Sequence, residues 1–191
     1  MSTYEPRRRT IHLRDFDYRQ PGFYFITICV ENHKIMFGKI ANDKMNLNRN
    51  GLVVEQVWRR LPQRFPGIEL DQYIVMPNHM HGIIILQDEQ PILYRKVHIE
   101  RVPERFNATV QNAARPYKQM PDLGQMIRSF KAEVSYRIHR TGTPGFTWQK
   151  RYYESVLSDE KALEFTRLYI INNPARWALD KLYRENLSSL G

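Results

Sequence analysis

Residues 68–86 read IELDQYIVMPNHMHGIIIL. Two runs rich in β-branched and aromatic residues flank the tripeptide Met-Pro-Asn at 76–78, and proline followed by asparagine is typical of a tight turn. The pattern therefore predicts two strands, 68–75 and 79–86, that are joined by this turn. Because neighbouring buried strands must belong to a larger sheet, this stretch sets the expectations for the rest of the chain.

The segments before this stretch predict more of the sheet and its first helix. Residues 23–30 (FYFITICV) are aromatic and β-branched throughout, which is typical of a strand buried on both faces. Residues 34–40 are expected to be its hairpin partner, with the turn at 31–33. Apolar residues then recur at helical spacing from 52 to 61, and two prolines end this predicted helix.

Three helices and one more strand are predicted downstream. Residues 122–142 predict an amphipathic helix, with Asp122 as its N-cap and Gly142 at its end. Residues 150–157 predict the last strand. A helix capped by Ser158 is expected to end before Pro174, and residues 175–187 predict a C-terminal helix.

The order of these elements, β-β-α-β-β-α-β-α-α, predicts an α+β fold with a mostly antiparallel, ferredoxin-like (RRM-like) sheet and helices packed on it. The length of 191 residues favours one domain, 1–191, without internal repeats. Two segments differ in character. Residues 1–20 form a basic arm, and residues 87–121 hold four prolines and an excess of Arg and Lys, which predicts a mobile basic insertion.

Composition excludes several classes of protein. The single cysteine, Cys29, excludes an internal disulfide framework and a cysteine-based zinc cluster, and it favours a reducing compartment. The sequence holds no apolar run of membrane-spanning or signal-peptide type, so we expect a cytoplasmic protein without a membrane partner. The formal net charge of +9 favours polyanionic partners, nucleic acid first.

His79 and His81 are the sharpest candidates for chemistry. Alternate side chains of a strand lie on one face, so both imidazoles are expected to project together. Two neutral imidazoles can bind a divalent metal ion if a third ligand comes from elsewhere. Two histidines that fall by chance on an exposed strand face fit the same spacing, and the spacing alone does not decide between the two interpretations.

Tyr169 and Asn173 are four residues apart and are expected to share one face of a helix. A tyrosine can act as a nucleophile, and an amide oxygen one turn further on can complete a His/His/Asn site whose oxygen ligand suits Mg²⁺ or Mn²⁺. A core tyrosine and a helix-capping asparagine fit this spacing equally.

Three segments carry a joint pattern: 75–84 (VMPNHMHGII), 148–153 (WQKRYY) and 169–174 (YIINNP). Together they resemble the single-tyrosine HUH transposases, and in particular the REP-associated tyrosine transposases. The likeness covers most of the chain, from residue 22 to residue 174.

The resemblance implies a ferredoxin-like enzyme that cleaves single-stranded DNA and transfers the strand, acting on hairpin DNA of the REP type. It implies that His79 and His81 are metal ligands, that Asn173 takes the third-ligand position, where relatives often have glutamine, and that Tyr169 is the nucleophile. The expected cofactor is Mg²⁺ or Mn²⁺. The expected intermediate is a 5′-phosphotyrosine, which stores the bond energy for rejoining.

Several other side chains are candidates for packing or for contacts with DNA. In the family pattern the segment around Tyr152 and Tyr153 is a strand, so both are interpreted as packing or base-stacking residues and not as nucleophiles. The cations can contact DNA. The alternatives are a solvated helix face for Arg128 and Lys131, and an unstructured tail for the arginines at 7–9. The candidate DNA-binding cations are Arg7, Arg8, Arg9, Arg128, Lys131, Lys150 and Arg151.

Two further functions stay open. A replication- or conjugation-initiator nickase of the same superfamily would use the same residues, and a protein that binds structured DNA or RNA without cutting would retain them without activity. The C-terminal helix at 175–187 can cover the surface that related enzymes use for dimers, which favours a monomer over a homodimer. The expected location is the cytoplasm, in association with the nucleoid.

Overall fold

The structure, a computed structural model, describes residues 19–87 and 122–183. Its centre is a four-stranded sheet in the order β4-β5-β1-β6, in which every neighbouring pair is antiparallel. The predicted strands 68–75 and 79–86 are both present. The strands of this sheet are β1 (Gly22–Cys29), β4 (Ile68–Val75), β5 (His79–Leu86) and β6 (Tyr153–Leu157).

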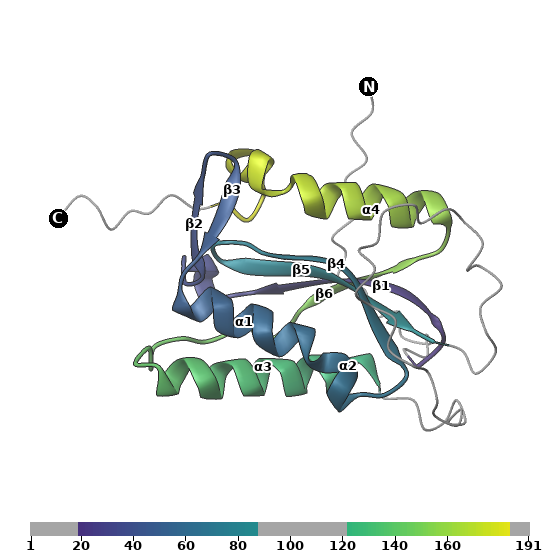
Figure 1. The fold of residues 1–191 in the computed structure, drawn as a ribbon, viewed down its shortest axis with the longest axis horizontal. Helices are drawn as coiled ribbons and strands as arrows, with labels where there is room; N and C mark the ends of the chain where they lie inside the picture. Colours follow the sequence, from purple (N-terminus) through teal and green to yellow (C-terminus); the bar gives the residue numbers. More distant parts are fainter. Residues whose placement is uncertain (1–18, 88–121, 184–191) are drawn as a thin grey trace.

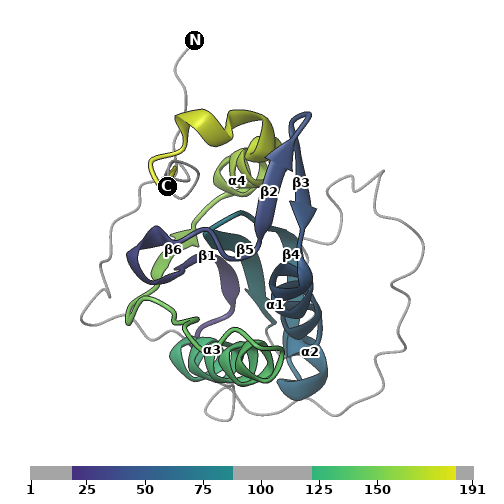
Figure 2. The same ribbon diagram turned by 90° about the vertical axis from the view of Figure 1, so that its left-hand side faces the viewer.

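Helices cover both faces of the sheet (Figures 1 and 2), which confirms the predicted α+β class. On one face lie α1 (Arg49–Arg59), α2 (Leu61–Arg64) and α3 (Leu123–Arg140). On the other lie α4 (Glu160–Asn172) and the short 3₁₀ helix η5 (Pro174–Leu179). Within the described ranges no helix is long and apolar enough to cross a membrane.

The side chains of β1 alternate between two cores. Tyr24, Ile26 and Ile28 pack in the larger core, under α1 and α3. Phe25 packs on the opposite face with Ile83 and residues of α4, in a smaller core. β1 is central in the sheet and covered by helices on both faces, so its side chains are buried on both faces, as the sequence predicted.

The predicted hairpin between 23–30 and 34–40 is wrong. β1 pairs with β5 on one side and with β6 on the other, and residues that follow it form the 3₁₀ helix η1 (Glu31–His33). A strand with two long-range neighbours gains a full set of backbone hydrogen bonds on both edges. Pairing between distant segments leaves no local sequence signal, which is why this arrangement was not predicted.

Residues 38–47 form a separate two-stranded sheet that the sequence analysis did not predict. β2 (Gly38–Ala41) pairs with β3 (Lys44–Leu47). Asn42 and Asp43 join them with φ angles of 51° and 56°, the left-handed conformation of a two-residue hairpin turn. Asparagine and aspartate tolerate this conformation better than other non-glycine residues.

The helix at 122–142 is confirmed, since Asp122 accepts a hydrogen bond from the backbone N–H of Gly124 as its N-cap. Two other helices begin elsewhere than predicted. Asn48 caps α1, and the first of the two prolines lies in the first turn of α2 instead of ending α1. Asp159, and not Ser158, caps α4, because its carboxylate reaches the N–H of Ala162 at 2.8 Å.

The remaining predicted boundaries also change. The last strand begins at residue 153 and not at 150. In place of a helix over 175–187 the structure has the shorter η5, and residues 184–187 lie outside the described residues. The basic arm up to residue 18, including Arg7, Arg8 and Arg9, and residues 88–121 of the predicted insertion also lie outside them.

Gly82 of β5 lies directly against Trp58 of α1. A Cβ atom at this position would lie 2.3 Å from Cζ2 of Trp58, whose side chain is fully buried. Gly82→Ala is therefore expected to lower the free energy of unfolding by about 1–3 kcal/mol, measured by urea denaturation. Gly145→Ala is the control, because a Cβ there meets nothing within 4 Å. Equal urea midpoints for the two variants would contradict the prediction.

Candidate active site

The two histidines lie at the start of β5, on the face covered by α4. Both are fully buried, and their Nε2 atoms are 3.0 Å apart. The expectation that they project together is confirmed, and they do not lie on an exposed strand face. Phe25 of β1 stacks on the ring of His81 at 5.3 Å, and Trp177 of η5 lies 5.9 Å from the ring of His79. These aromatic walls keep both imidazoles in place.

The Nδ1 atom of each imidazole faces a polar side chain. Thr27 Oγ1 lies 2.8 Å from Nδ1 of His81, and Asn78 Oδ1 lies 2.7 Å from Nδ1 of His79. Hydrogen bonds at Nδ1 orient the rings of metal-binding histidines and direct their Nε2 atoms at the ion. The arrangement presents both Nε2 atoms to the same point.

Asp180 completes a possible metal-binding group with the histidines. One of its carboxylate oxygens and a ring nitrogen from each histidine all lie within 4.8 Å of one another. An imidazole nitrogen lies about 2.1 Å from a bound divalent ion, so nitrogens 3.0 Å apart can share one. The group can therefore bind a metal ion. Asp180 was not predicted from the sequence, because no spacing pattern relates it to the histidine pair.

Asn173, the predicted third ligand, is buried at the C-terminal end of α4. Its Nδ2 donates to Oδ2 of Asp180 at 3.2 Å, which places the amide beside the metal-binding group. Its Oδ1 atom is buried and has no hydrogen-bond partner in the described part of the chain. A buried amide oxygen without a partner is costly, and an ion is one group that would satisfy it. The donor set thus fits a divalent cation that accepts nitrogen and oxygen ligands.

Tyr169 of α4 contacts the same group from the helix that covers this face of the sheet. Its hydroxyl oxygen lies 3.3 Å from Nε2 of His81, and the two rings are 5.2 Å apart. Its ring also meets Phe25 edge-on at 6.0 Å. The structure therefore brings Tyr169 and Asn173 of the helix to His79 and His81 of the strand, and it adds Asp180.

Comparison with known proteins places the chain in a family. No model of a known protein family matches it. An uncharacterized protein of Haemophilus influenzae is 38% identical over 179 residues, which cover 92% of this chain and 93% of that protein. The chain belongs to the family of this Haemophilus protein.

Solved structures show which fold this family has. The structure of a REP-associated tyrosine transposase bound to a REP hairpin matches with a TM-score of 0.52 and 17% identity, over 95% of this chain and 77% of that chain. A protein from Deinococcus radiodurans matches at a TM-score of 0.43 and 14% identity, over 80% of this chain and 91% of that chain. The first of these matches confirms the resemblance to the REP-associated tyrosine transposases at the level of the fold.

The predicted DNA-binding cations do not all lie near this site. Arg128 is exposed on α3, which covers the opposite face of the sheet from α4 (Figure 1). Lys150 and Arg151 are exposed in the segment before β6. Tyr152 packs against the larger core, as predicted, with the ammonium of Lys131 5.8 Å from its ring centroid.

The ammonium of Lys131 in α3 is hydrogen-bonded to the backbone of another segment. Its Nζ donates to the backbone carbonyls of Gln149, Lys150 and Arg151 at 2.8, 3.3 and 3.2 Å. Burial lowers the pKa of Lys131 to about 8. The side chain therefore ties the segment before β6 to α3, and the sequence pattern contained no sign of this role.

Lys131→Met is expected to lower the free energy of unfolding by about 1–3 kcal/mol, because the carbonyls lose their shared donor. Urea denaturation measures the change. Lys150→Met, which removes an exposed lysine from the same segment, is the matched control and should stay within about 0.5 kcal/mol of the parent protein. An equally small effect of Lys131→Met would show that the carbonyls do not depend on this ammonium.

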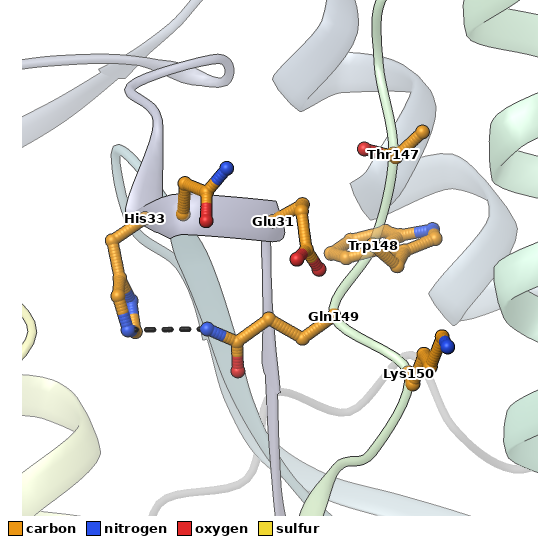
Figure 3. A pocket seen from close by; sticks show the side chains of 7 residues that line it. Glu31, His33, Thr147, Trp148, Gln149 and Lys150 are labelled. Atoms are coloured by element: carbon orange, nitrogen blue, oxygen red, sulfur yellow. Dashed lines mark hydrogen bonds between the residues drawn. The ribbon is translucent and has the colours of Figure 1, made fainter.

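An open pocket of about 700 Å³ lies where η1 meets the segment before β6. Figure 3 shows Gln149 extending across this pocket to His33, and their Nε2 atoms are 3.1 Å apart. The backbone N–H of Gln149 donates to the carbonyl of Cys29, and Val30 forms an isolated bridge with Trp148. These bonds fix η1 relative to the segment before β6, next to the turn that precedes β5.

Proposed function

We propose that this protein is a transposase-type enzyme, a metal-dependent endonuclease and strand transferase that acts on single-stranded hairpin DNA of the REP type. One observation carries the proposal. The hydroxyl of Tyr169 lies 3.3 Å from Nε2 of His81, which forms a group with the buried His79 and the half-buried Asp180. A potential nucleophile beside a potential metal site is an arrangement that can transfer a phosphodiester.

Tyr169 is the proposed nucleophile. Its phenolic oxygen attacks the phosphorus of a DNA phosphodiester, the new O–P bond forms, and the bond from phosphorus to the 3′-oxygen breaks. The phenolic proton is released, and the departing 3′-oxygen takes up a proton. The product is a 5′-phosphotyrosine, which retains the energy of the ester and lets a second 3′-hydroxyl reverse the step.

His79, His81 and Asp180, together with Oδ1 of Asn173, would hold a divalent ion, Mg²⁺ or Mn²⁺. When bound, such an ion acts as a Lewis acid that polarises the scissile phosphate. Imidazole nitrogens and carboxylate or amide oxygens are a ligand set that Mn²⁺ and Mg²⁺ accept. The buried amide oxygen of Asn173, which has no hydrogen-bond partner among the described residues, supports this assignment.

Hairpin DNA is the proposed partner for two reasons. The solved transposase with the same fold is bound to a REP hairpin, and the net charge of +9 favours a polyanion. The proposal includes a monomer with one domain, located in the cytoplasm with the nucleoid, in which the exposed cations Arg128, Lys150 and Arg151 contribute to DNA binding.

The test uses the full chain and single-stranded DNA that carries the hairpin repeats flanking its own gene. The strand is labelled at its 3′ end, so that the fragment joined to tyrosine stays visible, and a denaturing gel separates a covalent adduct from free DNA. We expect an adduct with Mn²⁺ or Mg²⁺ and none with EDTA. Hairpin binding without an adduct would favour a non-cleaving protein, and an adduct in EDTA would contradict the metal requirement.

A further inference from the structure

Asn78 lies in the turn between β4 and β5 and is fully buried. Its Nδ2 donates to the backbone carbonyl of His33 at 3.1 Å and to that of Leu182 at 2.7 Å. Its Oδ1 lies 2.7 Å from Nδ1 of His79. One amide thus joins η1, the C-terminal segment after η5 and the first histidine of the pair.

These contacts determine which nitrogen of His79 carries the proton. A carbonyl oxygen can only accept, so the two carbonyls require the NH₂ end of the Asn78 amide to face them. Its Oδ1 is then an acceptor, and the Nδ1 atom of His79 must be the donor. In the neutral ring Nε2 therefore carries the lone pair, and this atom faces His81.

The same amide holds the segment that carries Asp180. The carbonyl of Leu182 accepts from Asn78, and the N–H of Leu182 donates to Oδ1 of Asp180 at 2.7 Å. The bond to His33 secures the other side of the turn. In η1, Asn32 and His33 have φ angles of 55° and 53°, the left-handed conformation that asparagine and histidine adopt more readily than most other residues.

We propose that Asn78 is a positioning residue for the metal site, which selects the Nδ1–H tautomer of His79 and holds the segment that brings the carboxylate of Asp180 near the two histidines. The inference rests on the proposed function, in which both residues hold a divalent ion. Asn78 acts through His79 and through the backbone of Leu182, and it has no role as a ligand.

Two substitutions separate these roles. Asn78→Leu removes the acceptor for His79 and both donors. Asn78→Asp retains an acceptor for His79 and replaces the donors with an oxygen that repels the two carbonyls. Thr166→Val is the control, because Thr166 is equally buried and its hydroxyl donates to the carbonyl of Ala162 within α4.

The first readout is two-bond ¹H–¹⁵N NMR of the imidazoles in the ion-free protein, at a pH where they are neutral, which shows which ring nitrogen bears hydrogen. The second is the affinity for Mn²⁺ by titration calorimetry. The parent protein and Thr166→Val should show His79 protonated at Nδ1. Asn78→Leu should lose this tautomer and bind Mn²⁺ about 10- to 100-fold more weakly. Asn78→Asp should keep the tautomer but lose affinity, because Asp180 is released.

Two results would overturn the inference: Nε2–H in the parent protein, or an unchanged tautomer and affinity in Asn78→Leu. Near-ultraviolet circular dichroism shows whether each variant is folded. If Asn78→Leu does not fold, the Mn²⁺ affinity of Asn78→Asp still tests whether Asn78 positions Asp180, and an unchanged affinity would contradict this. A parent protein that binds no Mn²⁺ would contradict the metal in the proposed function. The NMR comparison would still decide whether Asn78 selects the tautomer, so the two failures are distinguishable.

Discussion

Tyr169→Phe is expected to abolish the covalent protein–DNA adduct, with a loss of at least about a thousandfold in the rate of its formation. The substitution removes one oxygen atom, and this oxygen is the proposed nucleophile. The ring itself remains between His81 and Phe25, at the distances of 5.2 and 6.0 Å described above. Folding and binding of the hairpin should therefore persist while the chemistry stops.

The measurement is the denaturing gel with 3′-labelled hairpin DNA, accompanied by a native gel for binding. Tyr152→Phe is the matched control, because Tyr152 packs on the larger core, on the other face of the sheet, and should retain the adduct. If the adduct survives in Tyr169→Phe, the nucleophile is a different tyrosine. Tyr153 would then be tested next, since it pairs with Thr27 in β1 beside the histidines.

Loss of a metal-binding side chain is expected to have the second large effect. His81→Ala should weaken Mn²⁺ binding by at least about 100-fold, more than loss of a residue that only orients a ligand, and should remove the adduct. Asp180→Asn should also weaken binding, because it removes the carboxylate charge without changing the shape of the side chain. In the parent protein Mn²⁺ should raise the melting temperature, since an ion that binds only the folded state stabilises it.

Calorimetry and thermal melts with and without Mn²⁺ measure both variants. Asp43→Asn is the matched control for Asp180→Asn, because Asp43 is exposed in the β2–β3 turn and asparagine tolerates its left-handed conformation equally well. Unchanged Mn²⁺ affinity in Asp180→Asn would remove Asp180 from the ligand set and leave Asn173 as the oxygen ligand. Unchanged affinity in His81→Ala would contradict the metal site itself.

Local pattern was sufficient for much of the fold and for part of the site. Strands 68–75 and 79–86 and the helix at 122–142 were predicted because apolar periodicity and capping residues act within a few residues of chain. The common face of His79 and His81 follows in the same way from the alternation of a strand, and that of Tyr169 and Asn173 from the pitch of a helix.

Other parts of the fold depended on contacts between distant segments. The composition of β1 indicated burial but did not indicate which strands pair with it. The predicted partner, the segment 34–40 that follows it in the chain, was wrong. The β2–β3 hairpin was missed because its turn, Asn42–Asp43, lacks the glycine that usually marks a two-residue turn. Lys131 was predicted as a candidate DNA-binding cation, since no local pattern shows that its ammonium donates to three carbonyls of another segment.

The order of residues along the chain was enough to identify an α+β fold, a histidine pair on one strand face and a tyrosine–asparagine pair on one helix face. These properties depend on backbone geometry over one or two turns, which side-chain spacing reports directly. Tertiary structure alone decided that the strand and the helix meet, that Asp180 joins them, and that Asn78 links His79 to the C-terminal segment. Such contacts result from packing between residues far apart in the chain, and burial makes their hydrogen bonds obligatory only once the fold has formed.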